Sequence, residues 1–288
     1  MIIKRDKAKH STKIPVPSES EIISSFHMLK DFVGPEKWKS AKVSGFEPKE
    51  GEESVRFVVT SDTHARHNYL KLPKGDVLLH CGDFTRLGSL EDIISFSNWI
   101  GQHNFKHVLV ISGNHEYTFD LDREKEFAPD LVNYEEFNDS KGMDFMKIRA
   151  HLSNCKYLEN SGTELYGYKI YGTPYQNMHS NSAFQRKEED LPKYWNMIPS
   201  DTDILLTHAP ALGICDKTIK EDLAGSKSLL DTLEKRVHPL LHFFGHVHEA
   251  YGAVVQTGTV HANASFCHVK YAPRNSPFVF DLKKLKPN

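Results

Sequence analysis

Five short polar motifs carry the residue types that bind metal ions. Nearly all of them directly follow an apolar stretch, and the motifs are Asp62-x-His64, Gly82-Asp83, Gly113-Asn114-His115-Glu116, His208 and Gly245-His246-x-His248. Their side chains offer carboxylate, amide and imidazole ligands but no thiolate, a set that suits Fe, Mn or Zn in a reactive site better than a structural zinc. The glycines of these motifs are expected to let the backbone turn sharply and come close to the ions.

Two of the motifs place ligands two residues apart. Along an extended segment, residues i and i+2 project to the same side, so Asp62 and His64 are expected to grip one ion together, as are His246 and His248. One ion would not need this many ligands. Two ions about 3.5–4 Å apart would, with a carboxylate shared between them, and such a pair binds a phosphoryl group and activates water against it. The residues therefore predict a dinuclear site for phosphoryl chemistry.

The elements that must position these motifs can be read from the apolar pattern. Strands are expected at residues 55–60, 76–80, 107–112, 169–172, 203–207, 240–244, 253–255, 257–261 and 278–281. Helices are expected at 89–99, opened by a capping box of Ser89 and Asp92, and at 143–152 and 226–237, with a loop-rich insertion at 119–142. This alternation predicts a layered α/β domain, with helices outside and sheets within. Ligands bind beyond the carboxyl ends of the strands in open α/β sheets, so the motifs should converge there.

The remaining composition is that of an ordinary globular chain, with 288 residues and a formal net charge of −2. That net charge does not favour non-specific binding along DNA or RNA. No apolar run is long enough to span a bilayer. Four dispersed cysteines and a start without a signal peptide predict reduced thiols and a cytoplasmic protein. Residues 1–53 are polar and predict a partly ordered arm, with a short helix near 22–32, ahead of a domain that covers 54–288.

Taken together and in this order, the five motifs resemble the motif set of the calcineurin-like metallophosphoesterases. The resemblance covers residues from about 55 to the end of the chain. Within that superfamily the chain is most similar to the animal metallophosphoesterase-domain-containing group, which is related to the class III cyclic nucleotide phosphodiesterases. The α/β pattern and this resemblance lead us to expect a four-layer α-β-β-α sandwich with a metal site at the carboxyl ends of the strands.

The resemblance also implies a role for each motif residue. Three residues would hold the first metal, Asp62, His64 and His248. Three others would hold the second, Asn114, His208 and His246, and Asp83 would bridge the two ions. His115 would contact the phosphate and assist the leaving oxygen, with Glu116 as support behind the ligands. Some members of the animal group lack the first histidine of Gly-His-x-His, but His246 is present here, so two divalent ions (Mn, Fe or Zn) are expected.

Other polar and aromatic residues have simpler explanations. Four further histidines are expected to be structural or solvated, His67, His80, His179 and His261. Asn263 follows a strand and is expected to orient a nearby loop. Four aromatic residues leave two interpretations open, a rim around the substrate or ordinary packing, and these are Tyr117, Phe119, Tyr134 and Tyr175.

The motifs leave three hypotheses for function. The first is a phosphodiesterase that hydrolyses small phosphodiesters through a metal-bound hydroxide, with cyclic nucleotides as the leading candidates and no membrane partner. The second is a phosphomonoesterase or protein phosphatase, but the segment from Gly82-Asp83 to Arg86 lacks the second acidic residue that the protein-phosphatase branch has. The third is a scaffold without activity, although none of the expected ligands is missing. Sequence alone does not predict the oligomeric state.

Overall fold

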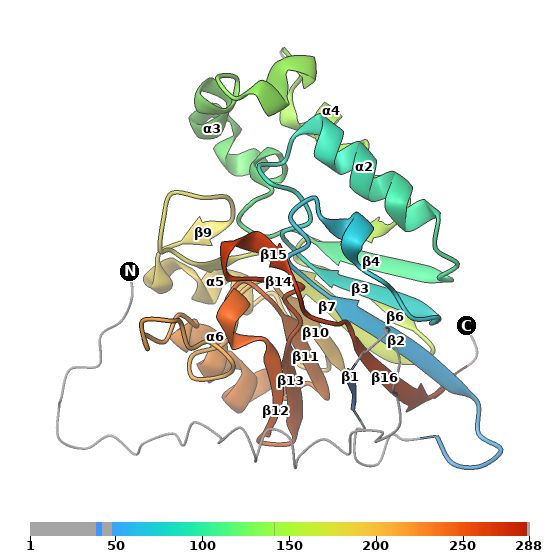
Figure 1. Cartoon of the computed structure of the whole chain (residues 1–288). Helices are drawn as coiled ribbons and strands as arrows, with labels where there is room; N and C mark the ends of the chain where they lie inside the picture. Colours follow the sequence, from blue (N-terminus) through green and yellow to red (C-terminus); the bar gives the residue numbers. More distant parts are fainter. Residues whose placement is uncertain (1–38, 42–47, 141, 287–288) are drawn as a thin grey trace, which may run out of the picture.

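Two six-stranded sheets face each other in the computed structural model, and helices cover their outer faces (Figure 1). The structure describes residues 39–41, 48–140 and 142–286. The strand order is β1-β16-β2-β3-β4-β5 in the first sheet and β12-β13-β11-β10-β7-β6 in the second. Both sheets are therefore mixed, with non-consecutive strands side by side.

Parallel strands form the centre of the first sheet. Its members are β1 (Lys39–Ala41), β16 (Phe278–Lys283), β2 (Ser54–Thr60), β3 (Val77–Cys81), β4 (His107–Ile111) and β5 (Lys156–Tyr157). The strands from β2 to β5 run parallel, while β16 lies antiparallel to β2. Because β2, β3 and β4 run in one direction, the loops that follow them emerge at one edge.

The second sheet has the same parallel centre and two antiparallel edges. Its members are β12 (Gly252–Gln256), β13 (Thr259–Asn263), β11 (Leu241–Phe244), β10 (Ile204–Thr207), β7 (Tyr168–Thr173) and β6 (Ser161–Leu165). Strands β13, β11, β10 and β7 are parallel, and the edge strands β12 and β6 are antiparallel to their neighbours. The loops after β10 and β11 therefore also emerge together.

Side chains alternate along the strands between the inner and outer faces of each sheet. On β2, Phe57 and Val59 belong to the apolar cluster between the sheets, whereas Val58 belongs to the cluster under the helices. Contact between the sheets is direct, since the rings of Phe243 on β11 and Phe280 on β16 lie 4.9 Å apart. Each sheet is thus buried on both faces, as the near-continuous apolar runs of its central strands require.

Helices supply the two outer layers. The first sheet is covered by α2 (Leu90–Gly101) and α4 (Phe145–Arg149). The second is covered by α5 (Pro192–Trp195) and by α6 (Lys227–Thr232), which continues as a π-helical turn, η6 (Leu233–Val237). The expected four-layer α-β-β-α sandwich is confirmed.

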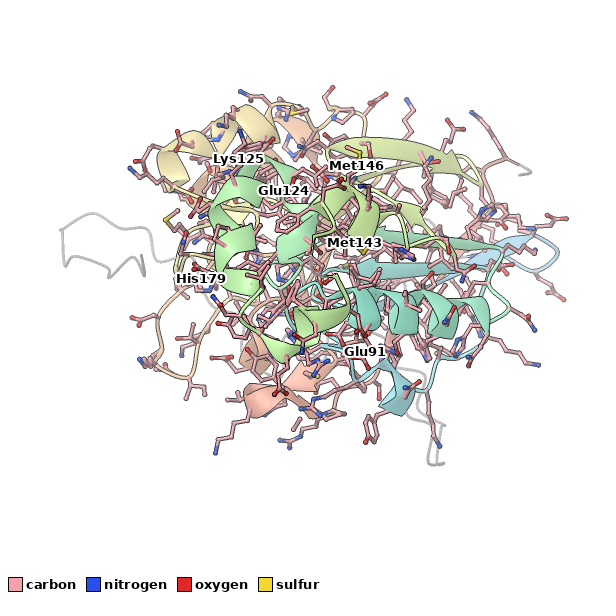
Figure 2. The ribbon with its side chains drawn as sticks, turned by 90° about the horizontal axis from the view of Figure 1, so that it is seen from above. Glu91, Glu124, Lys125, Met143, Met146 and His179 are labelled. Carbon is pink, nitrogen blue, oxygen red and sulfur yellow. The ribbon has the colours of Figure 1, made fainter. Side chains whose placement is uncertain are left out.

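A helical insertion follows β4, as expected from its acidic and aromatic sequence. It contains η2 (Tyr117–Phe119), η3 (Leu121–Arg123), α3 (Glu124–Leu131) and η4 (Glu135–Ser140). Figure 2, seen from above, places Glu124 and Lys125 of α3 and Met146 of α4 on the same side as Glu91 of α2. The insertion therefore extends the helical layer over the first sheet.

Short elements complete the chain between these layers. They are η1 (His67–Tyr69), the strand pair β8 (Gln176–Asn177) and β9 (Gln185–Arg186), η5 (Glu188–Asp190), η7 (His248–Ala250), the strand pair β14 (Cys267–His268) and β15 (Ala272–Pro273), and η8 (Val269–Tyr271). Most of them lie in loops, where the sequence has no periodic apolar pattern that would predict them. Among the residues that the structure describes, none of the helices combines the length and apolar character that crossing a bilayer requires.

Two helix predictions need correction. The capping box of α2 is only half formed: the Ser89 hydroxyl accepts a hydrogen bond from the Asp92 backbone N–H at 3.3 Å, but the Asp92 carboxylate binds Arg86 instead of reaching back to Ser89. The helix expected at 143–152 is shorter, since α4 begins after its cap Asp144 and ends at Arg149. The strong ion pair with Arg86 explains the first difference.

The N-terminal arm contributes a strand to the domain. Strand β1 pairs in parallel with β16 at the edge of the first sheet. The helix expected near 22–32 lies outside the described residues, and the domain boundary at 53/54 stays a prediction. Residues 39–41 nevertheless belong to the same sheet as the strands that follow the boundary.

The inter-sheet core gives a stability prediction. Leu79 is fully buried between the sheets, so Leu79→Ala should lower the free energy of unfolding by about 3 kcal/mol. The matched change Ile219→Ala, at a side chain that is 65% exposed, should alter it by less than about 0.5 kcal/mol. Urea denaturation followed by circular dichroism measures both, and equal losses in the two variants would contradict a core in this position.

Candidate metal centre

All five polar motifs meet at the carboxyl ends of the parallel strands. Three of them follow neighbouring strands of the first sheet, β2, β3 and β4, and two follow the neighbours β10 and β11 of the second. The sandwich places these two edges against each other, so the site spans both sheets. Every residue predicted as a metal ligand reaches this point: Asp62, His64, Asp83, Asn114, His208, His246 and His248.

A first cluster consists of Asp62, His64 and His248, whose ligand atoms lie within 4.8 Å of one another. Nε2 of His248 is 3.3 Å from Oδ1 of Asp62 and 3.1 Å from Nε2 of His64. Asp62 and His64 are buried, and His248 is partly exposed. One carboxylate and two imidazoles thus point at a common centre.

A second cluster contains Asp83, His208 and His246, again within 4.8 Å. Nε2 of His208 is 3.3 Å from Oδ2 of Asp83 and 3.1 Å from the side-chain oxygen of Asn114. The same Asp83 Oδ2 lies 3.8 Å from Nε2 of His64, in the first cluster. Asp83 therefore stands between the two groups.

The side-chain atoms of the second cluster suit a metal ion. Nδ1 of His208 lies 2.8 Å from the Cys81 carbonyl oxygen, which only accepts, so this nitrogen carries the proton. Nε2 therefore faces the oxygens of Asp83 and Asn114, at 3.3 and 3.1 Å. Metal binding here would require any proton on Nε2 to leave, because a ligating imidazole is neutral, and the three atoms would then all offer lone pairs to one cation. Imidazole and oxygen ligands without a thiolate suit divalent ions of the Mn, Fe and Zn class.

Burial and neighbouring charges act in opposite directions on the carboxylates. Burial alone would raise the pKa of Asp83, but the fields of His208 and His115 hold it well below its ordinary value. Burial would lower the pKa of His208, and the carboxylate of Asp83 raises it to about 9. Burial lowers the pKa of His64 to about 3. Asp83 is therefore held ionised beside a His208 ring that binds a proton readily, and a metal ion bound here would replace that proton.

Glu116 holds two of the site loops together behind the predicted metal ligands. Its buried carboxylate accepts hydrogen bonds from the backbone N–H groups of Asp83 (2.8 Å), Gly113 (2.7 Å) and Thr85 (2.9 Å), and from the Thr85 hydroxyl (2.8 Å). Burial and the nearby Asp83 raise the pKa of Glu116 to about 7. This geometry suits the supporting role expected for Glu116, because it fixes the loops after β3 and β4 relative to each other.

The expectation for the paired ligands needs two corrections. His246 and His248 do not share one cluster, since His246 lies in the second cluster and His248 in the first. The reason that the sequence suggested for the other pair is also wrong. Asp62 and His64 do meet, but both have left-handed backbones, with φ of 55° and 43°, and the segment is not extended. Asp83 and His246 share this conformation, with φ of 54° and 68°. Non-glycine residues held in this region cost free energy and gather at functional sites. Tight turns, and not the period of a strand, aim these side chains.

Two glycines allow the close approach of the loops. A Cβ on Gly245 would lie 1.9 Å from Oδ2 of Asp62, and one on Gly113 would lie 2.3 Å from Oδ1 of Asp83. No side chain fits at either position without displacing a carboxylate. The expectation that these glycines bring the backbone close to the site is consistent with this packing.

Several contacts of the site escaped the sequence analysis. The Ser265 hydroxyl lies within hydrogen-bond distance of two acceptors for its one hydrogen, Oδ2 of Asp62 at 2.9 Å and Oδ1 of Asn263 at 2.8 Å. The ring of Tyr271 packs beside three of the site histidines. Neither residue belongs to a motif, and each is more than 200 positions from Asp62, so no local pattern could reveal them.

The other predicted residues mostly have structural roles. His67 and His80 are buried against the Ser95 and Thr63 hydroxyls, and His261 is paired with His242. Asn263 binds the backbone oxygens of Val247 and Cys215, and thereby orients the loop after β11 as expected. Among the four aromatic residues, Phe119 and Tyr175 are buried in the core, Tyr117 donates to Ser182, and Tyr134 is 50% exposed.

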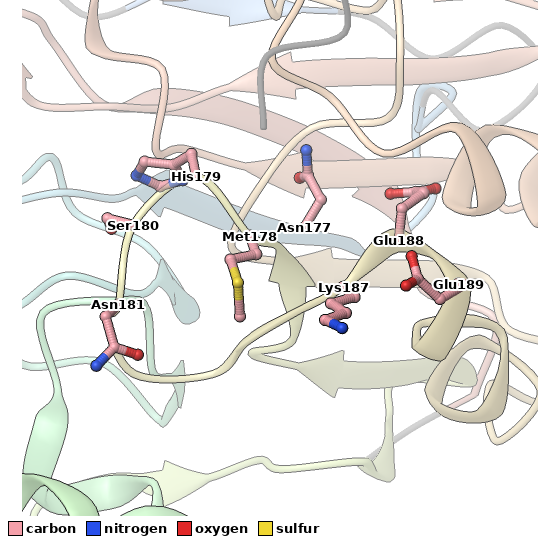
Figure 3. Close-up of a pocket in the computed structure, with 8 residues that line it drawn as sticks. All are labelled: Asn177, Met178, His179, Ser180, Asn181, Lys187, Glu188 and Glu189. Carbon is pink, nitrogen blue, oxygen red and sulfur yellow. The ribbon is translucent and has the colours of Figure 1, made fainter.

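His179 is exposed and lies closer to the site than expected. Its ring centroid is 4.8 Å from that of His246. It also lines a cavity of about 690 Å³ together with Asn177, Met178, Ser180, Asn181, Lys187, Glu188 and Glu189. Figure 3 shows these side chains on the loop between β8 and β9 and on the turn that follows. His179 thus borders both this cavity and the ring of His246 in the second cluster.

The family can be assigned from the sequence. Residues 55–250, a span that contains every motif described above, match the family model of the calcineurin-like phosphoesterases. The chain belongs to the calcineurin-like phosphoesterase family. Calcineurin-like phosphoesterases use divalent metal ions to hydrolyse phosphoric esters, so the clusters of Asp and His are its candidate metal-binding groups.

Similar proteins match this chain well beyond the five motifs. The chain is 40% identical over 235 residues to metallophosphoesterase domain-containing protein 1 of Homo sapiens, covering 79% of this chain and 71% of that protein. It is 40% identical over 237 residues to a UPF0046 protein of Caenorhabditis elegans, covering 80% and 82%. Among solved structures, the protein TT1561 of Thermus thermophilus aligns with a TM-score of 0.44 and 11% identity, over 73% of this chain and 89% of that chain. The resemblance to the animal metallophosphoesterase-domain-containing group is confirmed by the first two.

The close approach at Gly245 gives a prediction for this calcineurin-like phosphoesterase. Gly245→Ala should displace the Asp62 carboxylate and weaken metal binding at least tenfold, because the added Cβ cannot coexist with that oxygen. Gly252→Ala is the matched control, since its Cβ would meet nothing nearer than 3.9 Å. Metal content after dialysis, measured by mass spectrometry, distinguishes the two. Full metal retention in Gly245→Ala would argue against Asp62 as a ligand.

Proposed function

We propose that this protein is a dinuclear-metal phosphodiesterase that hydrolyses small phosphodiesters, with cyclic nucleotides as the leading candidates. The observation that carries the proposal is the position of Asp83, whose Oδ2 lies 3.3 Å from Nε2 of His208 and 3.8 Å from Nε2 of His64. A carboxylate so placed is suited to bridge two ions. Membership in the calcineurin-like family supports the metal-dependent ester hydrolysis.

The proposed ligands divide between the two ions as the clusters do. The first ion would be held by Asp62, His64 and His248. The second would be held by His208, His246 and the Asn114 oxygen, with Asp83 shared. Two divalent ions at these positions would supply a nucleophile from water and neutralise the charge of the phosphoryl group. The protein side chains then have to orient the ester and protonate its leaving oxygen.

His115 is our candidate for that proton transfer. Its Nδ1 lies 2.6 Å from the Arg86 carbonyl oxygen, so Nδ1 is the donor and the ring is fixed. Nε2 faces the site, 4.0 Å from Oδ2 of Asp83, and the side chain is 22% exposed. In its imidazolium form the ring carries a second proton on Nε2, which it can deliver to a leaving oxygen while the hydrogen bond of Nδ1 keeps the ring oriented.

The surroundings of Arg86 favour a diester over a phosphorylated protein. Arg86 is the arginine that follows Gly82-Asp83 in the chain, and a phosphatase would need a cation of this kind for the second charge of a monoester. Its guanidinium instead lies 2.9 Å from Asp92 and 3.7 Å from Glu136. Because these carboxylates neutralise it, the substrate with a single negative charge is the better fit.

A substrate comparison tests the proposal. Protein reconstituted with Mn²⁺ should hydrolyse bis(p-nitrophenyl) phosphate at least tenfold faster than p-nitrophenyl phosphate, judged by kcat/KM, and should open cyclic nucleotides. Asp83→Ala should lose nearly all of this activity, because the two ions would share no ligand. Release of p-nitrophenolate and chromatography of the nucleotides measure these rates.

Each contrary result selects an alternative. A preference for the monoester would indicate a phosphomonoesterase or protein phosphatase. No turnover of any phosphoester would favour a scaffold that keeps the fold. Activity that survives in Asp83→Ala would count against the dinuclear mechanism.

A separate prediction concerns His115. His115→Ala should keep both ions and lower kcat by about 10²–10⁴-fold for esters with a poor leaving group, such as cyclic nucleotides. The loss should be much smaller for p-nitrophenyl esters, whose leaving group needs no proton. The control is His151→Ala, at an exposed histidine after α4, which should match the wild type. Equal losses for both substrates would speak against His115 as the acid.

A further inference from the structure

One aromatic side chain outside the motifs packs against the proposed metal centre. The ring centroid of Tyr271 lies 4.6 Å from that of His64, 5.8 Å from His115 and 5.5 Å from His248, with interplanar angles of 82°, 73° and 83°. The ring thus stands nearly perpendicular to three imidazoles at once. Tyr271 is also 43% exposed, so part of its surface remains available to a ligand.

The backbone that presents Tyr271 is strained. Lys270 and Tyr271 have φ of 64° and 58°, two consecutive non-glycine residues in the left-handed region. Such residues persist only where the surrounding structure enforces them, and they gather at ligand-binding and active sites. This observation is independent of the ring contacts, and both lead to the same side chain.

Hydrogen bonds hold this turn against the first metal motif. The backbone N–H groups of Phe266 and Cys267 donate to the carbonyl oxygens of Ser61 and Asp62, at 2.8 Å and 3.3 Å. The pairing of β14 with β15 then brackets the turn, with Cys267 opposite Pro273. The position of the Tyr271 ring is therefore tied to the loop that carries Asp62 and His64.

We propose that Tyr271 is a specificity-determining residue that stacks against a flat aromatic group on the leaving side of the phosphoester, an aryl ring or a nucleobase. The inference rests on the proposed function, because it takes His115 as the residue beside the leaving oxygen. Tyr271 and His115 lie on the same side of the site, next to His64. The exposed part of an aromatic ring at this position attracts flat groups and interacts more weakly with a flexible alkyl group.

A purely structural role of Tyr271 would give different results from the proposed stacking role. A side chain that only shielded His64 would act on every substrate alike, and leucine would shield almost as well. A stacking partner would instead affect only substrates with a flat leaving group, and phenylalanine would replace it. Comparison of an aryl with an alkyl ester therefore decides between them.

The experiment uses the full chain loaded with Mn²⁺ and two diesters, methyl p-nitrophenyl phosphate and methyl 2,2,2-trichloroethyl phosphate. Tyr271→Leu should raise KM for the aryl ester about tenfold, the size of one base–aromatic stack, with kcat nearly unchanged. KM for the trichloroethyl ester should stay within about twofold, and Tyr271→Phe should behave as the wild type. Tyr69→Leu, at a tyrosine that is 71% exposed, should change neither constant.

Calorimetry gives a readout that does not depend on turnover. Phenylphosphonate should bind Tyr271→Leu about tenfold more weakly than the wild type, whereas methylphosphonate should bind both equally. Equal effects on aryl and alkyl ligands, no effect on either, or loss of metal from Tyr271→Leu would overturn the inference. Wild-type protein that turns over neither diester would overturn the proposed function, a result that is distinct from a wild type that is active but indifferent to Tyr271.

Discussion

Two buried carboxylates that stay ionised, Asp62 and Asp83, set the main constraint on this molecule. Charges without water are costly unless opposite charge lies beside them. The side chains of Asp62 and Asp83 face His64, His208 and His248 at 3.3–3.9 Å, and the field of Asp83 raises the pKa of His208 to about 9. Two divalent cations would replace the protons that these imidazoles otherwise supply, and the calcineurin-like family binds such ions. The rest of the architecture holds these carboxylates and imidazoles together.

Backbone conformation near the site follows from this constraint. Loops from two separate sheets have to approach within a hydrogen-bond length, as when the His246 N–H donates to both oxygens of Asp62 at 3.0 and 3.1 Å. Only glycine allows that distance at position 245, and the left-handed turns at Asp62 and His246 aim the ligands inward. The free energy lost in these turns is offset by the rigid sandwich beneath them, where both faces of each sheet are buried.

Sequence reasoning succeeded where the pattern is local. Apolar runs located the central strands, and the polar residues that end them located the site, because both signals lie within a few positions. It failed for the edge strand β6, whose Ser-Gly-Thr-Glu-Leu sequence is largely exposed and therefore carries no apolar pattern. It also missed Ser265 and Tyr271, because a contact that closes across more than 200 residues depends on the whole fold. The same limit produced the wrong reason for the Asp62–His64 pairing, since the turn that sets it depends on tertiary contacts.

The surroundings of the two clusters differ, and this asymmetry bears on the proposed substrate. Beside the first cluster lie His115 and the half-exposed Tyr271. Beside the second lies His179, which also lines the cavity of about 690 Å³. A diester with two separate organic groups could place one on each flank, with the leaving group on the side of His115. The single organic group of a monoester, or of a cyclic nucleotide, would contact one flank only. The asymmetry of the site therefore separates open-chain diesters from cyclic nucleotides within the proposed substrate class.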